Sequence, residues 1–357
     1  MSFTPSFRRA VRIATTLSLL TLIGSASVAS DESENVADLG IEALLELQLD
    51  QMAITGIHHT HDKGEWMVGY HFMYMGMDGN RNGTHKLSTQ DVFDDGFTVV
   101  PLEMSMEMHM LHVMYGISDS LTAMLVVPYQ RKAMDHLRMD GVEFTTRAHG
   151  IGDIQLSGLY SAYRDENHRL IAKAGLSFPS GSINKRDTIP GMGMMPDSKQ
   201  RLPYPMQLGS GTWDLLLGTT YLGYVTGWSW GADISSTVRL GENKYDYRLG
   251  SEYEISTWGS RLLTSWSSAS LRLNWGQWFN IHGADESLNP AMVQTADPDL
   301  QAGRRLDLLF GLNVFAPEGM LQGSRLMFEA GLPVYQWLDG PQLETDWMVS
   351  LNLEWSY

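Results

Sequence analysis

Apolar and polar side chains alternate strictly along residues 347–357. This two-residue period is typical of a β-strand whose two faces meet different surroundings. Aromatic residues stand at both ends of the apolar row, where the two interfaces of a bilayer would lie if that row faced lipid. The pattern therefore predicts a membrane-spanning strand. Its apolar row consists of Trp347, Val349, Leu351, Leu353, Trp355 and Tyr357.

The same alternation recurs along most of the chain, in segments bounded by turn residues. Such a segment can put one row of side chains into lipid and the other into a polar lumen. We therefore expect an all-β fold, a transmembrane antiparallel up-and-down β-barrel of about twelve strands, an even number that keeps both termini in the periplasm. The expected strands are 65–77, 102–117, 120–132, 149–163, 168–179, 212–223, 228–240, 247–257, 262–275, 304–315, 324–335 and 345–357.

The connections between these segments support the same topology, with the barrel occupying residues 65–357. Long outer loops that alternate with short periplasmic turns are expected of such a barrel, whereas a β-sandwich has no reason to alternate this way. The connections after odd-numbered strands are 78–101, 133–148, 180–211 and 276–303, with two shorter ones at 241–246 and 336–344. Those after even-numbered strands are 118–119, 164–167, 224–227, 258–261 and 316–323.

The first residues, 1–29, have the features of a secretory signal peptide. Arg8, Arg9 and Arg12 give a positive start, a short apolar stretch follows, and small residues lead to a cleavage site after Ala29. A retained membrane anchor is the alternative, although the apolar stretch is short for a span.

Residues 30–64 form a separate segment ahead of the barrel. Their pattern predicts a short N-terminal amphipathic helix over 36–52, either periplasmic or docked in the lumen, followed by a His-rich linker. The linker carries His58, His59 and His61. Two interpretations stay open for this cluster: a solvated, disordered linker, or a metal site.

Composition narrows the class of protein. Hydrophobic residues make up 43% of the chain but are dispersed, and no segment after the start is long and apolar enough for a membrane-spanning helix. The net charge of −16 argues against nucleic acid as a partner, since binding phosphates needs basic surface. The absence of cysteine suits an exported barrel closed by backbone hydrogen bonds. We expect the outer membrane of a Gram-negative bacterium, with outer-membrane lipid as a partner.

Methionine is frequent, with 22 residues in the chain, and it is concentrated in the first two predicted strands. In the first strand an aromatic row suits lipid, which places the opposite row of Met and His in the lumen. A second Met row lies on one face of the next strand, and cross-strand neighbours are about 5 Å apart. The two rows are Met67, His71, Met73, Met75 and Met77, and Met104, Met106, Met108, Met110, His112 and Met114.

The orientation of the second row is open. If its methionines face the lumen, Glu107 and His109 approach lipid. Either the strand rises beyond the membrane there, or a bulge switches its faces. The remaining alternative is that the Met row itself faces lipid.

These rows predict a ladder of ligands for a soft metal ion. Thioether sulfur favours Cu(I), and by the same softness Ag(I), while imidazole adds affinity for copper or zinc. The ion would be cargo, and no obligatory cofactor is expected. The alternative is packing, because Met is a flexible gap-filler. Further soft candidates are Met124, Met134, His136, Met139, Met192, Met194 and Met195, and Asp91, Asp94 and Asp95 would concentrate cations at the mouth.

The rest of the expected lumen face is charged. Such side chains either tune permeation or pair into a network that fills a narrow barrel, and pairing is the favoured interpretation for most of them. The set is Asp153, Asp214, Asp233, Arg239, Arg248, Glu252, Glu254, Arg272, Arg305, Asp307, Arg325, Glu329 and Glu354.

Nothing in the sequence indicates an enzyme. It contains no Gly-x-Ser-x-Gly, no His-Glu-x-x-His and no Gly-rich phosphate loop. A non-enzymatic barrel is therefore expected.

Several runs resemble a known family. They are Met-Glu-Met-His-Met-Leu at 106–111, Tyr-Gly-Ile-Ser-Asp-Ser-Leu-Thr at 115–122 with Val-Pro-Tyr at 127–129, Gly-Ile-Gly-Asp at 150–153, Leu-Ser-Phe-Pro-Ser-Gly-Ser-Ile at 176–183, Pro-Tyr-Pro-Met-Gln-Leu-Gly-Ser-Gly-Thr at 203–212, and 289–300. Together they resemble a family of outer-membrane transporters within the wider group named for phenol meta-pathway degradation. The resemblance runs from about residue 65 to the end. It implies transport and a loose association with metal-resistance systems, and it supplies no catalytic residues.

The aromatic end of the chain also resembles the signal that bacterial barrels present to the barrel assembly machinery, which is therefore an expected partner. The sequence as a whole predicts an outer-membrane channel that handles Cu(I) or Ag(I) through a Met- and His-lined lumen, with periplasmic metal-efflux components as further partners. Two alternatives stay open. One is a channel for small hydrophobic or aromatic compounds, and the other is a structural barrel, plugged by its own side chains, that acts through its loops.

Overall fold

A computed structural model describes residues 59–191, 196–316 and 324–356. The signal peptide, the helix expected over 36–52, His58, Met192, Met194, Met195 and Tyr357 lie outside the described residues. Within the described ranges, no helix has the length and apolar character needed to cross a membrane.

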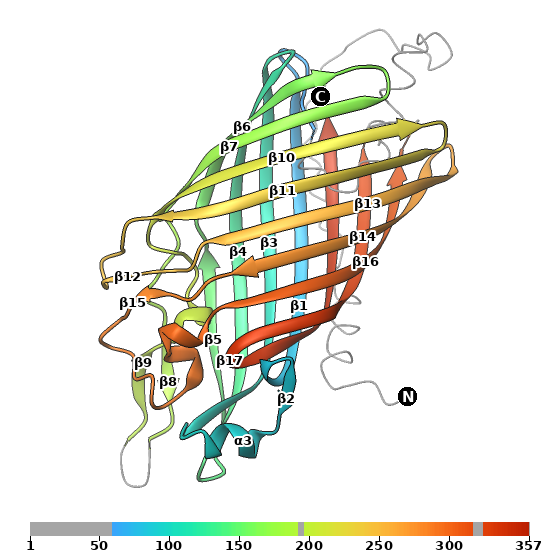
Figure 1. The fold of residues 1–357 in the computed structure, drawn as a ribbon. Coiled ribbons are helices and arrows are strands. Elements are labelled where there is room, and N and C mark those ends of the chain that lie inside the picture. The colour runs from blue at the N-terminus through green and yellow to red at the C-terminus, as the bar shows by residue number, and fades with distance from the viewer. Residues whose placement is uncertain (1–58, 192–195, 317–323, 357) are drawn as a thin grey trace, which may run out of the picture. The chain divides into compact units, whose positions relative to one another are not determined.

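Within these residues, eleven antiparallel strands form a ring, shown in Figure 1, and pairing between its last and first members closes the barrel. Each strand pairs with the next one along the chain, as expected of an up-and-down barrel. The strands are β1 (Trp66–Gly83), β3 (Val99–Ser118), β4 (Leu121–Arg138), β6 (Ile154–Arg164), β7 (His168–Phe178), β10 (Trp213–Val225), β11 (Trp228–Leu240), β13 (Glu252–Thr264), β14 (Ser267–Trp278), β16 (Gly303–Phe315) and β17 (Arg325–Ser356).

The last element, β17, supplies two runs of the barrel. Its first part pairs antiparallel with β16, up to Leu338, and its second part pairs antiparallel with β1, up to Ser356. Because β1 and β16 are separated by an unbroken series of antiparallel pairs, they run in opposite directions. The chain must therefore reverse within β17, and Gly340 has the positive φ of +89° that suits such a turn. Counted as runs, the ring agrees with the predicted twelve strands, and the predicted fold class is confirmed.

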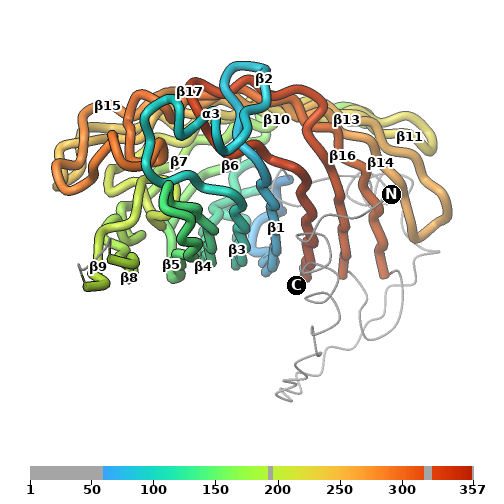
Figure 2. Tube along the Cα trace, turned by 90° about the horizontal axis from the view of Figure 1, so that it is seen from below, coloured from blue at the N-terminus to red at the C-terminus, as the bar shows by residue number. Residues whose placement is uncertain are grey.

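Shorter strands and helices lie at the end of the barrel that carries the long loops. Figure 2 views the ring from that end, where β8 lies beside β5. Strand β5 continues β6 along β4 after a break. The elements are β2 (His85–Leu87), α3 (Thr89–Asp94), β5 (Glu143–Ile151), β8 (Arg186–Ile189), β9 (Ser198–Arg201), η2 (Tyr204–Met206), β12 (Tyr247–Arg248), β15 (His282–Gly283), η3 (Gln294–Ala296) and η4 (Pro298–Leu300).

The two faces of the wall are the inverse of those in a water-soluble protein. In β16, Phe310 and Leu312 point outward and are 61% and 55% exposed, while Asp307 and Asn313 are buried inside. The same alternation orients β17, where Asn352 and Glu354 are buried on the inner face. An apolar outer surface around a polar interior is expected where lipid surrounds the barrel.

Candidate functional site

The methionine rows predicted from the sequence lie on the inner face of the barrel. In β1 and β3 the register runs without a shift from Met67, which faces Met114, to Met75, which faces Met106. Gly69, on the same face of β1, lies against the imidazole of His112. Met73, Met75, Met106, Met108 and Met110, with His71, line internal cavities. We call this side of the lumen, built from β1, β3 and β4, the methionine wall.

The structure decides between the alternatives for Glu107 and His109. The register from 103 to 116 shows no shift against β4 or β1, so no bulge switches the faces of β3 there. His109 lies on the outer face and its Nδ1 is 2.6 Å from the hydroxyl of Tyr70. Glu107 lies further toward the loops, 4.0 Å from the exposed Arg131. A polar pair directly beyond a Tyr–His contact is consistent with a strand that rises out of the membrane at this level.

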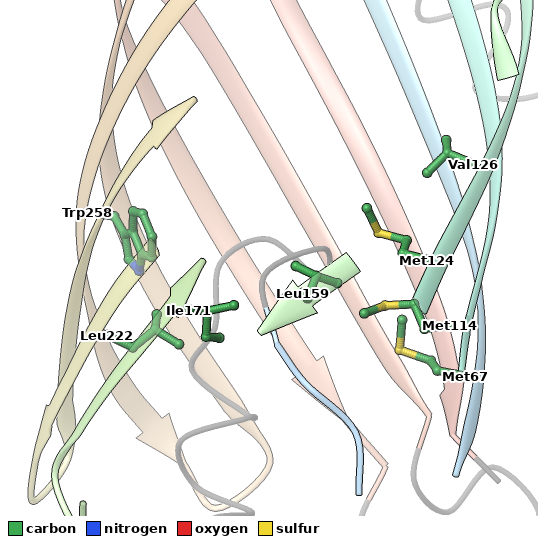
Figure 3. Packing of buried hydrophobic residues seen from close by; sticks show 8 residues of the cluster. All are labelled: Met67, Met114, Met124, Val126, Leu159, Ile171, Leu222 and Trp258. Carbon is green, nitrogen blue, oxygen red and sulfur yellow. The ribbon is translucent and has the colours of Figure 1, made fainter. Parts of the chain in front are cut away.

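Two sets of three methionines lie directly opposite one another across three strands. The periplasmic triplet consists of Met67, Met114 and Met124, at the end with short turns. Figure 3 shows its three side chains, from β1, β3 and β4, pointing into the barrel side by side. The outer triplet consists of Met77, Met104 and Met134, near the loops.

The opposite side of the lumen is an ionic wall. It is built from β10, β11, β13, β14, β16 and β17, and most of its charges are paired. Arg272 donates to Glu329 Oε2 at 2.5 Å, and Arg305 lies 2.8 Å from Asp307. Asp214 and Glu252 both bind Arg239 at 2.6 Å, and Arg325 lies 3.7 Å from Glu354. Two further predicted residues lie on this wall: Asp233 accepts a hydrogen bond from Thr220, and Glu254 lines a cavity.

Two residues predicted among the lumen charges, Arg248 and Asp153, do not lie on the ionic wall. Arg248 lies in β12, which pairs with β15 in a small separate sheet, so the predicted strand 247–257 begins too early. The ring strand starts at Glu252 instead, two residues after Gly250, which passes so close to the backbone of Phe279 that no side chain fits there. Asp153 lies at the break between β5 and β6 and anchors inserted loops: it accepts hydrogen bonds from the backbone N–H groups of Gly181 and Ser210.

The outer loops fold back over the lumen, which the sequence did not predict. Lys132, on the inner face of β4, donates to the carbonyl oxygens of Pro205 and Gln207 at 2.9 and 2.6 Å. The inserted segment packs Leu202, Met206 and Leu208 against the outer triplet. Pro203 and Pro205 in that long loop were the available signal, since prolines favour a fixed, irregular path.

An ion pair holds this outer cap together. Arg201 pairs with Asp285, and its guanidinium stacks over the ring of Tyr245 at 3.6 Å. Burial raises the pKa of Asp285, but hydrogen bonds from Ser287 and Arg201 outweigh it and hold that pKa below its ordinary value. The cap therefore keeps a charged, bonded carboxylate at neutral pH.

Two cavities of about 410 Å³ each lie in the lumen. The outer cavity lies beneath the cap and is lined by Met106, Met108 and Met110 together with Leu208, Phe279 and Arg239. The inner cavity lies between the two walls and is lined by His71, Met73, Met75, Trp258, Met327 and the ionic residues around Arg272. Met73 and Met75 face Met108 and Met106 directly across one strand pair. We call these four residues the methionine septum, since two of them line the inner cavity and the two that they face line the outer one.

The role of the Met and His residues as metal ligands stays a prediction. Among the described residues, no group of three or more His, Asp or Glu side chains is placed to hold a metal ion. Along one strand, inward-facing residues are two positions apart, which separates them by about 7 Å. Sharing of an ion is therefore most direct across strands, and along one strand it requires side chains long enough to lean toward each other.

The terminal strand has the orientation that its pattern predicted. Trp347, Val349, Leu351, Leu353 and Trp355 alternate with the inward residues, and Trp347 stacks on Tyr74 with ring centroids 4.9 Å apart. Recognition of this row by the assembly machinery stays a prediction.

Comparison with known proteins supports the architecture. No family model and no curated protein matches the sequence. An outer membrane channel from Pseudomonas putida F1 superposes with a TM-score of 0.57 at 13% identity, over 85% of this chain and 99% of that one. The transport unit of the autotransporter AIDA-I from Escherichia coli superposes with a TM-score of 0.50 at 9% identity, over 88% and 98%. The protein is an outer-membrane β-barrel of a Gram-negative bacterium. At these identities the likenesses concern the fold.

Proposed function

We propose that this barrel is an outer-membrane channel for small hydrophobic or aromatic compounds. The observation that carries the proposal is the methionine septum between the two cavities. Each cavity has a volume within the range of about 300–1,000 Å³ of small-molecule sites. Both cavities combine apolar side chains with fixed polar groups, as such sites do, and the inner one also takes in charged residues of the ionic wall.

The side chains of the septum can move aside for a solute, as passage between the cavities requires. Met73, Met75, Met106 and Met108 are all half-buried and therefore not locked on every side by neighbours. Methionine is unbranched and can rotate to accommodate an apolar solute of irregular shape. A solute held in the outer cavity would reach the inner one by displacing these side chains. The resemblance to the family of outer-membrane transporters supports the same function.

Uptake into intact cells tests the proposal. Cells that lack their own channels for styrene would be compared with the same cells producing this barrel, since an intact outer membrane is a barrier that liposomes do not reproduce. We expect faster accumulation of styrene with the wild-type barrel and no change for a small sugar. Met108→Lys would abolish the gain, because a solute would have to pass a charge, whereas Met108→Leu would keep it.

Equal styrene uptake with and without the folded barrel would overturn the proposal and favour a plugged structural barrel. A gain for the sugar as large as for styrene would also overturn it, because that result requires a polar pore. Heat-modifiable mobility of each variant would establish that it has folded.

A further inference from the structure

We propose that the periplasmic triplet, with His112, His59 and His61 close to it, forms a binding site for one soft monovalent metal ion, Cu(I) or Ag(I). This site goes beyond the proposed channel function and does not depend on it. Side chains with sulfur and nitrogen donors lie close together at the periplasmic end of the barrel.

The three sulfurs come from consecutive strands. Met67 faces Met114 in the β1–β3 pair, and Met114 faces Met124 in the β3–β4 pair. Directly opposed residues have Cβ atoms about 5 Å apart, and all three side chains turn into the lumen together (Figure 3). Each is at most 2% exposed. Three flexible thioethers at one level can therefore reach a common point.

An imidazole lies immediately beside them. His112 is two residues from Met114 on the same inner face of β3 and is fully buried. It lies over Gly69 of β1, where any side chain would overlap its ring. Neither ring nitrogen of His112 has a hydrogen-bond partner among the described residues. A buried donor or acceptor left unpaired is destabilising, so both nitrogens of this ring are open to a ligand.

A second pair of histidines reaches the same place from the chain ahead of β1. The N–H of His61 donates to the hydroxyl of Thr122 at 2.8 Å, and Thr122 is fully buried two residues before Met124. His59 lies 4.7 Å from His61, ring centroid to ring centroid. It is also within electrostatic range of His112 on β3, Arg169 on β7 and Arg325 on β17, which are three different strands of the ring.

The chemistry selects the ion. Thioethers are neutral, soft donors and imidazole is a borderline donor, a set that favours Cu(I) and Ag(I) over hard or divalent oxygen-seeking cations. Arg169 and Arg325 nearby disfavour a high positive charge, which further favours a monovalent ion. Apolar side chains pack against both triplets, so the histidines make the difference. Both ring nitrogens of His112 lack a hydrogen-bond partner among the described residues, whereas the one histidine close to the outer triplet along β4, His136, stacks on Phe144 with ring centroids 4.8 Å apart. The outer triplet is therefore a matched control for the titration within the same chain.

The test is a titration of the folded mature barrel with Cu(I) under reducing conditions and with Ag(I), each against a competing chelator. We expect one saturable site. Met67→Leu/Met114→Leu/Met124→Leu should weaken binding at least about 100-fold, since loss even of a supporting contact around a metal costs 10- to 100-fold. Met77→Leu/Met104→Leu/Met134→Leu should change it less than about threefold, because distant sites act independently. His112→Leu should weaken binding as well.

X-ray absorption of the Cu(I)-loaded wild-type barrel tests the ligands directly and does not require either triple variant to fold. We expect both sulfur and nitrogen in the coordination shell, with Cu–S near the usual thioether distance. A shell of nitrogen or oxygen alone would overturn the site, as would no saturable binding or an equal loss in both triple variants. Styrene uptake is not measured in this experiment, so its outcome and that of the proposed channel are distinguishable.

Discussion

The methionine wall and the ionic wall face the same lumen and follow the same alternation, yet they are stabilised differently. On the ionic wall most charges have a specific partner at a fixed distance, such as Arg272 with Glu329. On the methionine wall the side chains contact one another without direction, and the polar exceptions, His71 and His112, have ring nitrogens with no hydrogen-bond partner among the described residues.

The two walls therefore differ in how far their side chains can be displaced or substituted without loss of stability. A paired charge has one good geometry, and losing its partner leaves an uncompensated charge in a poorly hydrated space. Thioethers have many acceptable geometries, so neighbours can shift around them. The ionic wall therefore fixes the shape of the lumen, and the methionine wall adapts to what occupies it. Substitutions on the two walls should have effects of very different size.

The largest effect is expected from Glu329→Ala on the ionic wall. It leaves the Arg272 guanidinium, which is 18% exposed, without the carboxylate that it contacts at 2.5 Å. We expect a loss of about 3 kcal/mol in the free energy of unfolding, as for other broken buried pairs. Urea unfolding followed by tryptophan fluorescence measures it.

The double variant Arg272→Met/Glu329→Leu is the control, since replacing a buried pair with apolar side chains is often neutral. It should recover most of the lost stability. A loss below about 1 kcal/mol for Glu329→Ala would instead mean that water solvates this wall as it does a surface pair.

An intermediate effect is expected where the methionine wall is tightly packed, at Gly69→Ala. The new methyl group would overlap the imidazole of His112, and the shift should cost about 1–3 kcal/mol, as overpacking does. The same substitution made in a His112→Ala background should cost much less, because the overlapping ring is gone. Equal costs in both backgrounds would contradict the close approach of these two residues.

Much of the barrel could be predicted from the sequence, because a two-residue period needs no information about distant contacts. The inward rows of β1 and β17 follow directly from that alternation, whereas the orientation of the Met row in β3 stayed open until its register against β1 and β4 was known. The outer cap could not be predicted, because it depends on contacts such as that between Lys132 and the carbonyl oxygen of Gln207, which are 75 residues apart. The placement of His59 in the lumen was missed for the same reason: a short irregular segment carries no period.

The smallest effect is expected at Met108→Leu, in the septum. Met108 is half-buried and borders a cavity, so a side chain of similar volume can settle without displacing the wall. We expect a change below about 1 kcal/mol in the free energy of unfolding, the usual result of a volume-conserving swap. The same urea experiment measures it. If Met108→Leu cost as much as Glu329→Ala, the septum would be a rigid, closely fitted partition, and the contrast between an adaptable wall and a fixed one would fail.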